Sequence, residues 1–408
     1  MNITKPFRIF FIFLFILLFS SCSIFAYYYT WSTLDSTLPV SSNIISDESN
    51  PNPLNLDCGS CILMDQHTGT ILYSYNSHDK LRPASVTKLM SIYLVMEAIK
   101  TGKLNYDTPI PCSEKASSMG GSQIWLDTTE TLTVDEMLKA VFVVSANDCI
   151  TALSEYVGGT EENFVKMMND KAKELGMNDS CFKNCHGIDE DGHEMSSYDI
   201  AIISKELLNN FPEITKYTTI WHDTLRNGKS ELINTNKLVR NYKGCTGLKT
   251  GSTSSALFNL SASATRDDFS LIAVVMKAPS SAIRFENASK LLDYGFNNFE
   301  NKKLVSSGDK IKTIEISKGT KSYITAIASQ DCSHIIPKGT NVNIEQSVVV
   351  NPISCPIKQG DTIGTINYTL NNEIIANCEL ISDSDVDKLN ISSMEKFILK
   401  KWFYLLRI

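Results

Sequence analysis

The segment Arg82-Pro-Ala-Ser-Val-Thr-Lys-Leu-Met90 decides the fold, because it opens a strongly apolar helical pattern with two polar side chains, Ser85 and Lys88. Proline and its neighbour resist the interior of a helix, so Pro83 fits just before a helix start. We therefore expect a helix over residues 86–99. Ser85 would lie at its N-terminus, where free backbone N–H groups and the helix dipole favour developing negative charge. Lys88 would lie one turn away on the same face.

A hydroxyl beside an amine suggests a nucleophile and its proton acceptor, provided that the lysine is neutral. Desolvation and a second nearby cation can achieve that. The Ser-x-x-Lys pattern alone is weak, because it recurs at Ser180, Ser307 and Ser393. Those copies fall in a short loop, in a turn and in a C-terminal helical pattern. Taken alone, Ser85 is equally well explained as an ordinary helix N-cap.

Two further short motifs follow in the chain, Ser145-Ala-Asn147 and Lys249-Thr-Gly251. The first interrupts an apolar run, so its polar side chains either form hydrogen bonds with neighbouring groups or face a cleft. The second leads into a strand-like stretch, where glycine permits the close approach of a ligand. Its lysine and threonine could hold a carboxylate. A second Lys-Thr-Gly, at residues 100–102, is more simply the C-terminal cap of the first helix.

The order of elements predicts an α+β domain over residues 57–299. Strand patterns open it, helical patterns follow, and strand patterns return near its end. Helices inserted between strands of one antiparallel sheet are typical of this class. The expected strands span residues 62–65, 70–73, 257–264 and 270–276, and the further expected helices span residues 134–157, 161–175 and 198–209.

The last hundred residues have a different sequence pattern, with short alternating stretches in place of long helical ones. Alternating patterns at 311–316 and 341–345, separated by glycine turns, predict a small all-β domain over residues 300–384. Residues 385–408 then predict a basic amphipathic helix that carries Trp402 on its apolar face. Such a helix suits a membrane interface. Docking on the β domain and a dimer contact are the alternatives.

The N-terminus carries an export signal in residues 1–26: Lys5 and Arg8 precede an apolar run that ends in small residues. Cleavage, lipidation of Cys22 and retention as an anchor all stay open. Residues 27–56 are rich in Ser, Pro and Asn and predict a flexible tether. We therefore expect an exported protein at the outer face of the plasma membrane.

Composition excludes some functions. A formal net charge of −7 argues against a nucleic-acid partner. The eleven cysteines are scattered. Cys58-Gly-Ser-Cys61 has redox or zinc spacing, and Cys181, Cys185, His186 and His193 could be drawn as a metal site. The paired ligands of a true zinc site are missing, so we predict no metal and no cofactor.

Taken in order, the three motifs resemble those of low-molecular-mass penicillin-binding proteins, specifically serine D-alanyl-D-alanine carboxypeptidases of the Gram-positive vegetative or sporulation type. The likeness covers roughly residues 56–300. It includes four further segments, Met119-Gly-Gly-Ser-Gln-Ile124, His186-Gly-Ile-Asp-Glu-Asp-Gly-His193, Asn234-Thr-Asn-Lys-Leu238 and Leu291-Leu-Asp-Tyr-Gly295. The resemblance implies a penicilloyl-serine transferase or β-lactamase-like fold. It also implies an enzyme that removes the terminal D-alanine from peptidoglycan stem peptides and that β-lactams inhibit covalently.

The resemblance also implies a role for each motif residue. Ser85 would be acylated, Lys88 would take its proton, and Ser145 would relay protons to the leaving D-alanine. The remaining residues would bind substrate: the Asn147 amide holds the peptide backbone, Lys249 and Thr250 hold the terminal carboxylate, the peptide lies along the Gly251 strand, and the N–H groups of Ser85 and Ser252 form the oxyanion hole. The stretch Ala256-Leu-Phe-Asn-Leu260 departs from relatives and puts the pocket shape in doubt.

Two rival functions remain. A class A-like β-lactamase needs a carboxylate to activate the deacylating water, and Glu174 is the candidate, although it ends a helical pattern and its spacing fits poorly. A penicillin sensor or peptidoglycan-binding module would form the same acyl-enzyme but never turn over. Catalytic turnover separates the sensor from the carboxypeptidase.

Overall fold

The computed structural model describes residues 52–340 and 342–390, together with residues 395, 398, 399 and 402. The predicted export signal, most of the predicted tether and most of the predicted C-terminal helix lie outside the described residues. The predicted start of that helix at residue 385 is wrong, because Val386 and Lys388 form β-bridges with Ile357 and Gly319 of the second domain. Among the described residues, no helix combines the length and the apolar character needed to cross a membrane.

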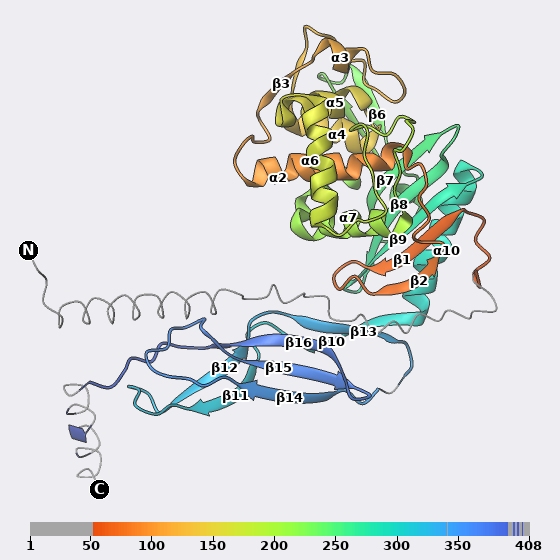
Figure 1. The fold of residues 1–408 in the computed structure, drawn as a ribbon. Helices are drawn as coiled ribbons and strands as arrows, with labels where there is room; N and C mark the ends of the chain where they lie inside the picture. Colours follow the sequence, from red (N-terminus) through yellow and green to blue (C-terminus); the bar gives the residue numbers. More distant parts are fainter. Residues whose placement is uncertain (1–51, 341, 391–394, 396–397, 400–401, 403–408) are drawn as a thin grey trace, which may run out of the picture. The chain divides into compact units, whose positions relative to one another are not determined.

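A five-stranded antiparallel sheet forms the centre of the first domain, in the order β2-β1-β9-β8-β7 (Figure 1). The first two strands open the domain, and the other three return after all but one of its helices. The strands are β1 (Ser60–Asp65), β2 (Ile71–Tyr75), β7 (Cys245–Thr253), β8 (Leu257–Arg266) and β9 (Phe269–Ala278). This is the sheet that the sequence predicted.

Helices fill the sequence between β2 and β7, and one more follows β9. They are η1 (Ala84–Thr87), α2 (Lys88–Lys100), α3 (Glu114–Ser117), α4 (Val134–Val143), α5 (Asn147–Gly158), α6 (Glu161–Glu174), α7 (Ser197–Asn210), η2 (Pro212–Ile214), α8 (Thr215–Thr218), α9 (Leu238–Asn241) and α10 (Ser281–Asn298). Two small hairpins pair β3 (Pro109–Pro111) with β4 (Thr131–Thr133), and β5 (His222–Leu225) with β6 (Ser230–Ile233).

The core lies on both faces of the sheet, because successive side chains of a strand point to opposite sides. In β1, Ile62 and Met64 join the apolar cluster that contains α2 and α7. Cys61 and Leu63 join a second cluster on the other face, with side chains of α10. A sheet buried on both faces explains why β9 is apolar almost throughout.

The single helix expected over residues 134–157 is in fact two helices, α4 and α5. The chain breaks at Ser145, whose φ of +66° is left-handed. The backbone N–H of Asn147, which begins α5, donates to the carbonyl of Ser122 at 2.7 Å. Both helices are largely buried, so apolar residues continue on either side of the break and the pattern did not reveal it.

The second domain is all-β, as predicted. β10 (Phe299–Val305) pairs with β13 (Cys332–Pro337), and a five-stranded antiparallel sheet has the order β11-β12-β16-β15-β14. Its strands are β11 (Lys310–Glu315), β12 (Tyr323–Ala328), β14 (Glu345–Val350), β15 (Thr362–Leu370) and β16 (Glu373–Ser382). The strand expected at 341–345 begins only at Glu345, which pairs with Thr369, one residue before β15 ends.

Candidate active site

Ser85 and Lys88 meet as the sequence predicted. Pro83 precedes the short turn η1, which contains Ser85, and Lys88 is the first residue of α2. The Lys88 Nζ lies 2.9 Å from the Ser85 Oγ. The preceding Ala84 has a left-handed φ of +50°. Such backbone strain in a residue with a side chain is concentrated at functional sites.

Burial makes Lys88 suitable as a proton acceptor. Its side chain is 0% exposed. Desolvation lowers the pKa of Lys88 to about 7, although Cys185 and Asp148 oppose the shift. Near neutral pH, much of the enzyme therefore carries a neutral amine beside the Ser85 hydroxyl.

The loop after α6 supplies a contact that the sequence analysis did not assign. The backbone carbonyl of His186 accepts a hydrogen bond from the Lys88 Nζ at 2.7 Å. Gly187 follows in a left-handed conformation, and a Cβ there would lie 1.9 Å from the Ala84 carbonyl oxygen. Only glycine allows the loop to press against the start of the nucleophile helix. The other histidine of this segment, His193, bonds the Thr87 Oγ1 at 2.8 Å.

The break between α4 and α5 presents the second motif. The Ser145 Oγ is buried and has no hydrogen-bond partner among the described residues, and the same holds for the Asn147 Oδ1. The Asn147 Nδ2 donates to the Gly120 carbonyl at 2.7 Å. Buried polar atoms are normally paired. These two atoms are therefore free to bind a ligand.

The third motif lies in a strand, β7, as predicted, and the structure places β7 at the edge of the sheet. A Cβ on Gly251 would lie 2.9 Å from the backbone N of Ser85 and 2.8 Å from the Pro83 carbonyl oxygen. This close approach sets the N–H groups of Ser85 and Ser252 on neighbouring pieces of backbone. Thr250 is held by a 2.7 Å contact between its Oγ1 and that of Thr235.

Two further basic side chains, Lys249 and Arg284, lie close to this part of the site. Lys249 is 1% exposed and its Nζ donates to the Thr250 carbonyl at 2.9 Å. Desolvation, then Lys88 and Arg284, lower the pKa of Lys249 well below its usual value. Arg284 of α10 donates to the carbonyls of Gly251 (3.2 Å) and Asn259 (3.3 Å), and its Nε has no partner among the described residues.

Arg284 was not found from the sequence, because it belongs to no motif. The one feature that could have pointed to it is its place in the helix, since Arg284 occupies a position among the buried residues of α10. Burial lowers the pKa of Arg284 to about 10, so it still carries its charge at neutral pH. It is thus a permanent cation behind β7.

The competing motif copies lie elsewhere. Glu174 is 65% exposed at the end of α6 and pairs with Lys171 at 2.7 Å. The Ser180 hydroxyl donates to Asp199, and Ser307 is exposed in a turn. Lys100 ends α2, and Ser393 lies outside the described residues. Where the structure describes the chain, no group of His, Cys, Asp and Glu could hold a metal ion, and the cysteines form no disulfide.

Comparison with known proteins agrees with this geometry. The family described as D-alanyl-D-alanine carboxypeptidase matches residues 47–280, and the C-terminal domain of penicillin-binding protein 5 matches residues 299–388. The D-alanyl-D-alanine carboxypeptidase DacF of Bacillus subtilis is 37% identical over 361 residues, which is 87% of this chain and 92% of that protein.

Solved structures agree as well. Penicillin binding protein 5 from Haemophilus influenzae is 32% identical, with a TM-score of 0.70 over 82% of this chain and 98% of that one. Penicillin-binding protein D2 from Listeria monocytogenes, in its ampicillin-bound form, is 29% identical, with a TM-score of 0.55 over 60% of this chain and 99% of that one. The predicted fold class, an α+β catalytic domain followed by a β domain, is confirmed. The chain belongs to the D-alanyl-D-alanine carboxypeptidase family of low-molecular-mass penicillin-binding proteins.

Proposed function

We propose that this D-alanyl-D-alanine carboxypeptidase works through an acyl-enzyme on Ser85. The neutral Lys88 amine takes the Ser85 proton, and the oxygen attacks the carbonyl carbon of the penultimate D-alanine. The scissile C–N bond breaks, and the departing D-alanine amine receives a proton. Water then hydrolyses the ester. The observation that carries the proposal is the 2.9 Å contact between a fully buried amine and the hydroxyl.

The surrounding groups take complementary roles. The unpartnered Ser145 hydroxyl is placed to pass the proton to the leaving amine, and the Asn147 amide holds the peptide backbone. The N–H groups of Ser85 and Ser252 stabilise the oxyanion. The terminal carboxylate enters the cationic corner that Lys249, Thr250 and Arg284 form. Its negative charge would favour protonation of Lys249 as it binds.

The same groups would accept a β-lactam, because its strained amide carbonyl can occupy the place of the scissile peptide carbonyl. The Listeria relative, whose structure is described as ampicillin-bound, supports this extension. With a β-lactam, the cleaved amide stays tethered, so the acyl-enzyme would persist.

A turnover experiment separates the carboxypeptidase from a sensor. Purified protein incubated with a pentapeptide ending in D-Ala-D-Ala should release many equivalents of D-alanine per protein, because the substrate's leaving group diffuses away and water can enter. The measurement is D-alanine released over time. Release that stops at one equivalent would support the sensor instead.

We further propose residues 57–299 as the catalytic domain, a β domain that begins at residue 300 and continues past 384 to the bridged residues Val386 and Lys388, and the segment after residue 390 as a helix that binds the outer face of the plasma membrane. The basic and apolar composition of that last segment supports membrane binding.

A protein lacking residues 1–51 should co-sediment with anionic vesicles, and further removal of 391–408 should abolish co-sedimentation with little change in turnover. Unchanged co-sedimentation would contradict the anchor.

A further inference from the structure

Asp148 is a buried carboxylate beside the active site, and the mechanism above gives it no part. It follows Asn147 directly in α5 and is 0% exposed. Its Oδ2 accepts the backbone N–H groups of Ile124 and Leu126, each at 3.0 Å, and its Oδ1 accepts that of Cys149 at 2.9 Å. Burying a carboxylate costs free energy unless such donors compensate it. Asp148 therefore binds the chain firmly at residues 124 and 126.

The segment that Asp148 binds is strained, and it is held from its other side as well. Trp125 lies between the two N–H groups, with a left-handed φ of +55°, and is 76% exposed. A bulky residue keeps such a conformation only where its surroundings impose it. Arg226, in the turn between β5 and β6, donates to the carbonyls of Ile124 at 2.8 Å and Trp125 at 3.4 Å. Asp148 thus holds the N–H groups of this short segment, and Arg226 holds its carbonyl groups.

The same stretch of chain positions Asn147. The Gly120 carbonyl accepts a hydrogen bond from the Asn147 Nδ2, and the Ser122 carbonyl accepts one from the Asn147 backbone N–H, both at 2.7 Å. With its Nδ2 bound in this way, the amide presents its Oδ1, which has no partner among the described residues. A closed path of contacts therefore runs from Asp148 through residues 120–126 and back to Asn147.

We propose that Asp148 is a positioning residue for the reaction: by holding residues 120–126, it fixes the Asn147 amide with the Oδ1 available to a backbone N–H of the substrate. The inference rests on the proposed function, in which Asn147 holds the peptide. An asparagine amide that rotates by half a turn exchanges its oxygen for its nitrogen and offers a donor where the peptide needs an acceptor. A fixed Gly120 carbonyl prevents that exchange, because it accepts only from the nitrogen.

The test is a double-mutant cycle on kcat/KM for a pentapeptide ending in D-Ala-D-Ala. Asp148→Asn keeps the shape of the side chain but replaces one acceptor oxygen by a donor group, so it can no longer accept all three N–H groups. This variant and Asn147→Ala should each lower kcat/KM about 5- to 100-fold, the effect of losing one buried hydrogen-bond partner. The double variant should stay within about twofold of the worse single variant, because Asp148 acts through Asn147.

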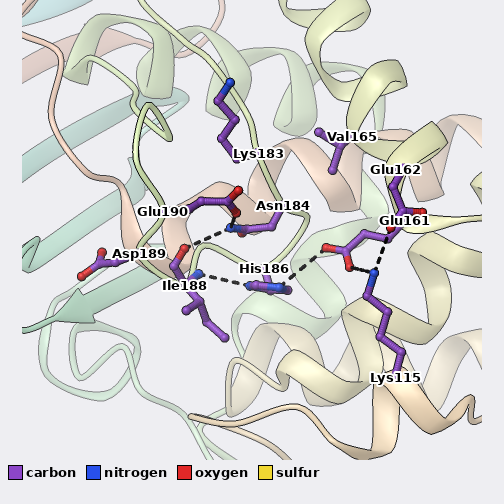
Figure 2. A pocket seen from close by; sticks show the side chains of 10 residues that line it. All are labelled: Lys115, Glu161, Glu162, Val165, Lys183, Asn184, His186, Ile188, Asp189 and Glu190. Atoms are coloured by element: carbon purple, nitrogen blue, oxygen red, sulfur yellow. Dashed lines mark hydrogen bonds and ion pairs between the residues drawn. The ribbon is translucent and has the colours of Figure 1, made fainter.

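The pH dependence of acylation is a second measurement, because the side chains around Lys88 set its protonation. They are Cys185 and His186 from the loop after α6, Glu161 from α6, Asp148 from α5 and Lys249 from β7. Burial raises the pKa of Cys185 to about 12, and burial, then Lys88, lower the pKa of His186 to about 4, so both are uncharged near neutral pH. Glu161 lies 3.6 Å from the His186 ring and is neutralised by the Lys115 Nζ at 2.8 Å (Figure 2).

Asp148→Asn would therefore remove a negative charge that lies near Lys88 and opposes the lowering of its pKa. A nearby negative charge favours the ammonium form. Without it, the rise of the acylation rate with pH should move to lower pH. A loss of stability alone would reduce the amount of folded enzyme without moving the midpoint of that rise.

Asp199→Asn is the matched control. Asp199 is also a buried carboxylate in the first turn of a helix, α7, and is 1% exposed. It accepts the backbone N–H of Asp179 at 2.9 Å and the Ser180 hydroxyl at 2.7 Å. Its replacement should lower the thermal unfolding temperature but keep the wild-type kcat/KM and the wild-type pH midpoint.

Thermal unfolding shows which variants are folded. If Asp148→Asn does not fold, Arg226→Gln, which loosens the same segment from its other side, replaces it in the cycle and should also be non-additive with Asn147→Ala. Undiminished kcat/KM in Asp148→Asn, fully additive losses, a pH midpoint that does not move, or the same losses in Asp199→Asn would overturn the role of Asp148 and leave the proposed function intact. Wild-type protein that releases no D-alanine would overturn the proposed function itself.

Discussion

Replacing Lys88 by alanine is expected to slow acylation of Ser85 by about 100- to 10,000-fold, the usual effect of removing a positioned general base. Among the described residues, the Ser85 hydroxyl forms a side-chain hydrogen bond with the Lys88 Nζ alone. The measurement is the rate at which a chromogenic β-lactam labels the protein. Lys100→Ala, at the other end of α2 and exposed, is the matched control and should label at the wild-type rate.

The acylation rate should also depend on pH, in a direction set by the protonation of Lys88. Lys88 acts as a base only when neutral, and its pKa is lowered to about 7. The wild-type acylation rate should therefore rise as pH increases through about 7, and the alanine variant should lack that rise. A variant that acylates at the wild-type rate, or a wild-type rate that falls over this interval, would contradict the role of Lys88.

Removing the negative charge of the substrate's terminal carboxylate should lower kcat/KM strongly in the wild type and much less in a variant without Lys249. Amidating the carboxylate, or replacing Lys249 by glutamine, should each lower kcat/KM roughly 30- to 150-fold, because a charge-assisted hydrogen bond in a desolvated cleft contributes about 2–3 kcal/mol. The two losses should not add, since both remove one contact. The measurement is a double-mutant cycle over two enzymes and two substrates.

Lys243→Gln, which changes an exposed lysine just before β7, is the control and should leave both substrates unaffected. Arg284 keeps its charge in the Lys249 variant, so a residual preference for the carboxylate of a few-fold is compatible with the proposal. Fully additive losses would mean that Lys249 does not contact the carboxylate, which would then be assigned to Arg284 and Thr250.

Local spacing made the central part of the site predictable. Ser85 and Lys88 are one helical turn apart, so a helix start necessarily brings them together. Gly251 was interpretable because a glycine within a strand pattern indicates close backbone approach. The strands of the sheet were predictable from alternating polar and apolar residues and from short apolar runs. The helices were predictable from apolar residues that recur at helical spacing.

The rest could not be predicted, for identifiable reasons. The hydrogen bond from Lys88 to the His186 carbonyl uses a backbone atom, which every residue possesses. Arg284 enters the site from α10 through tertiary packing, and an arginine in an amphipathic helix usually faces solvent. Apolar residues continue on either side of the break at Ser145.

The central claim is that Ser85 carries the acyl group, and the most direct measurement is mass-spectrometric peptide mapping after incubation with ampicillin. Ring opening adds the whole β-lactam to the nucleophile, so the mass of one intact ampicillin should be found on Ser85. Ser85→Ala should take up none. A label on Ser145, Ser180 or Ser307, or undiminished labelling of Ser85→Ala, would contradict the account.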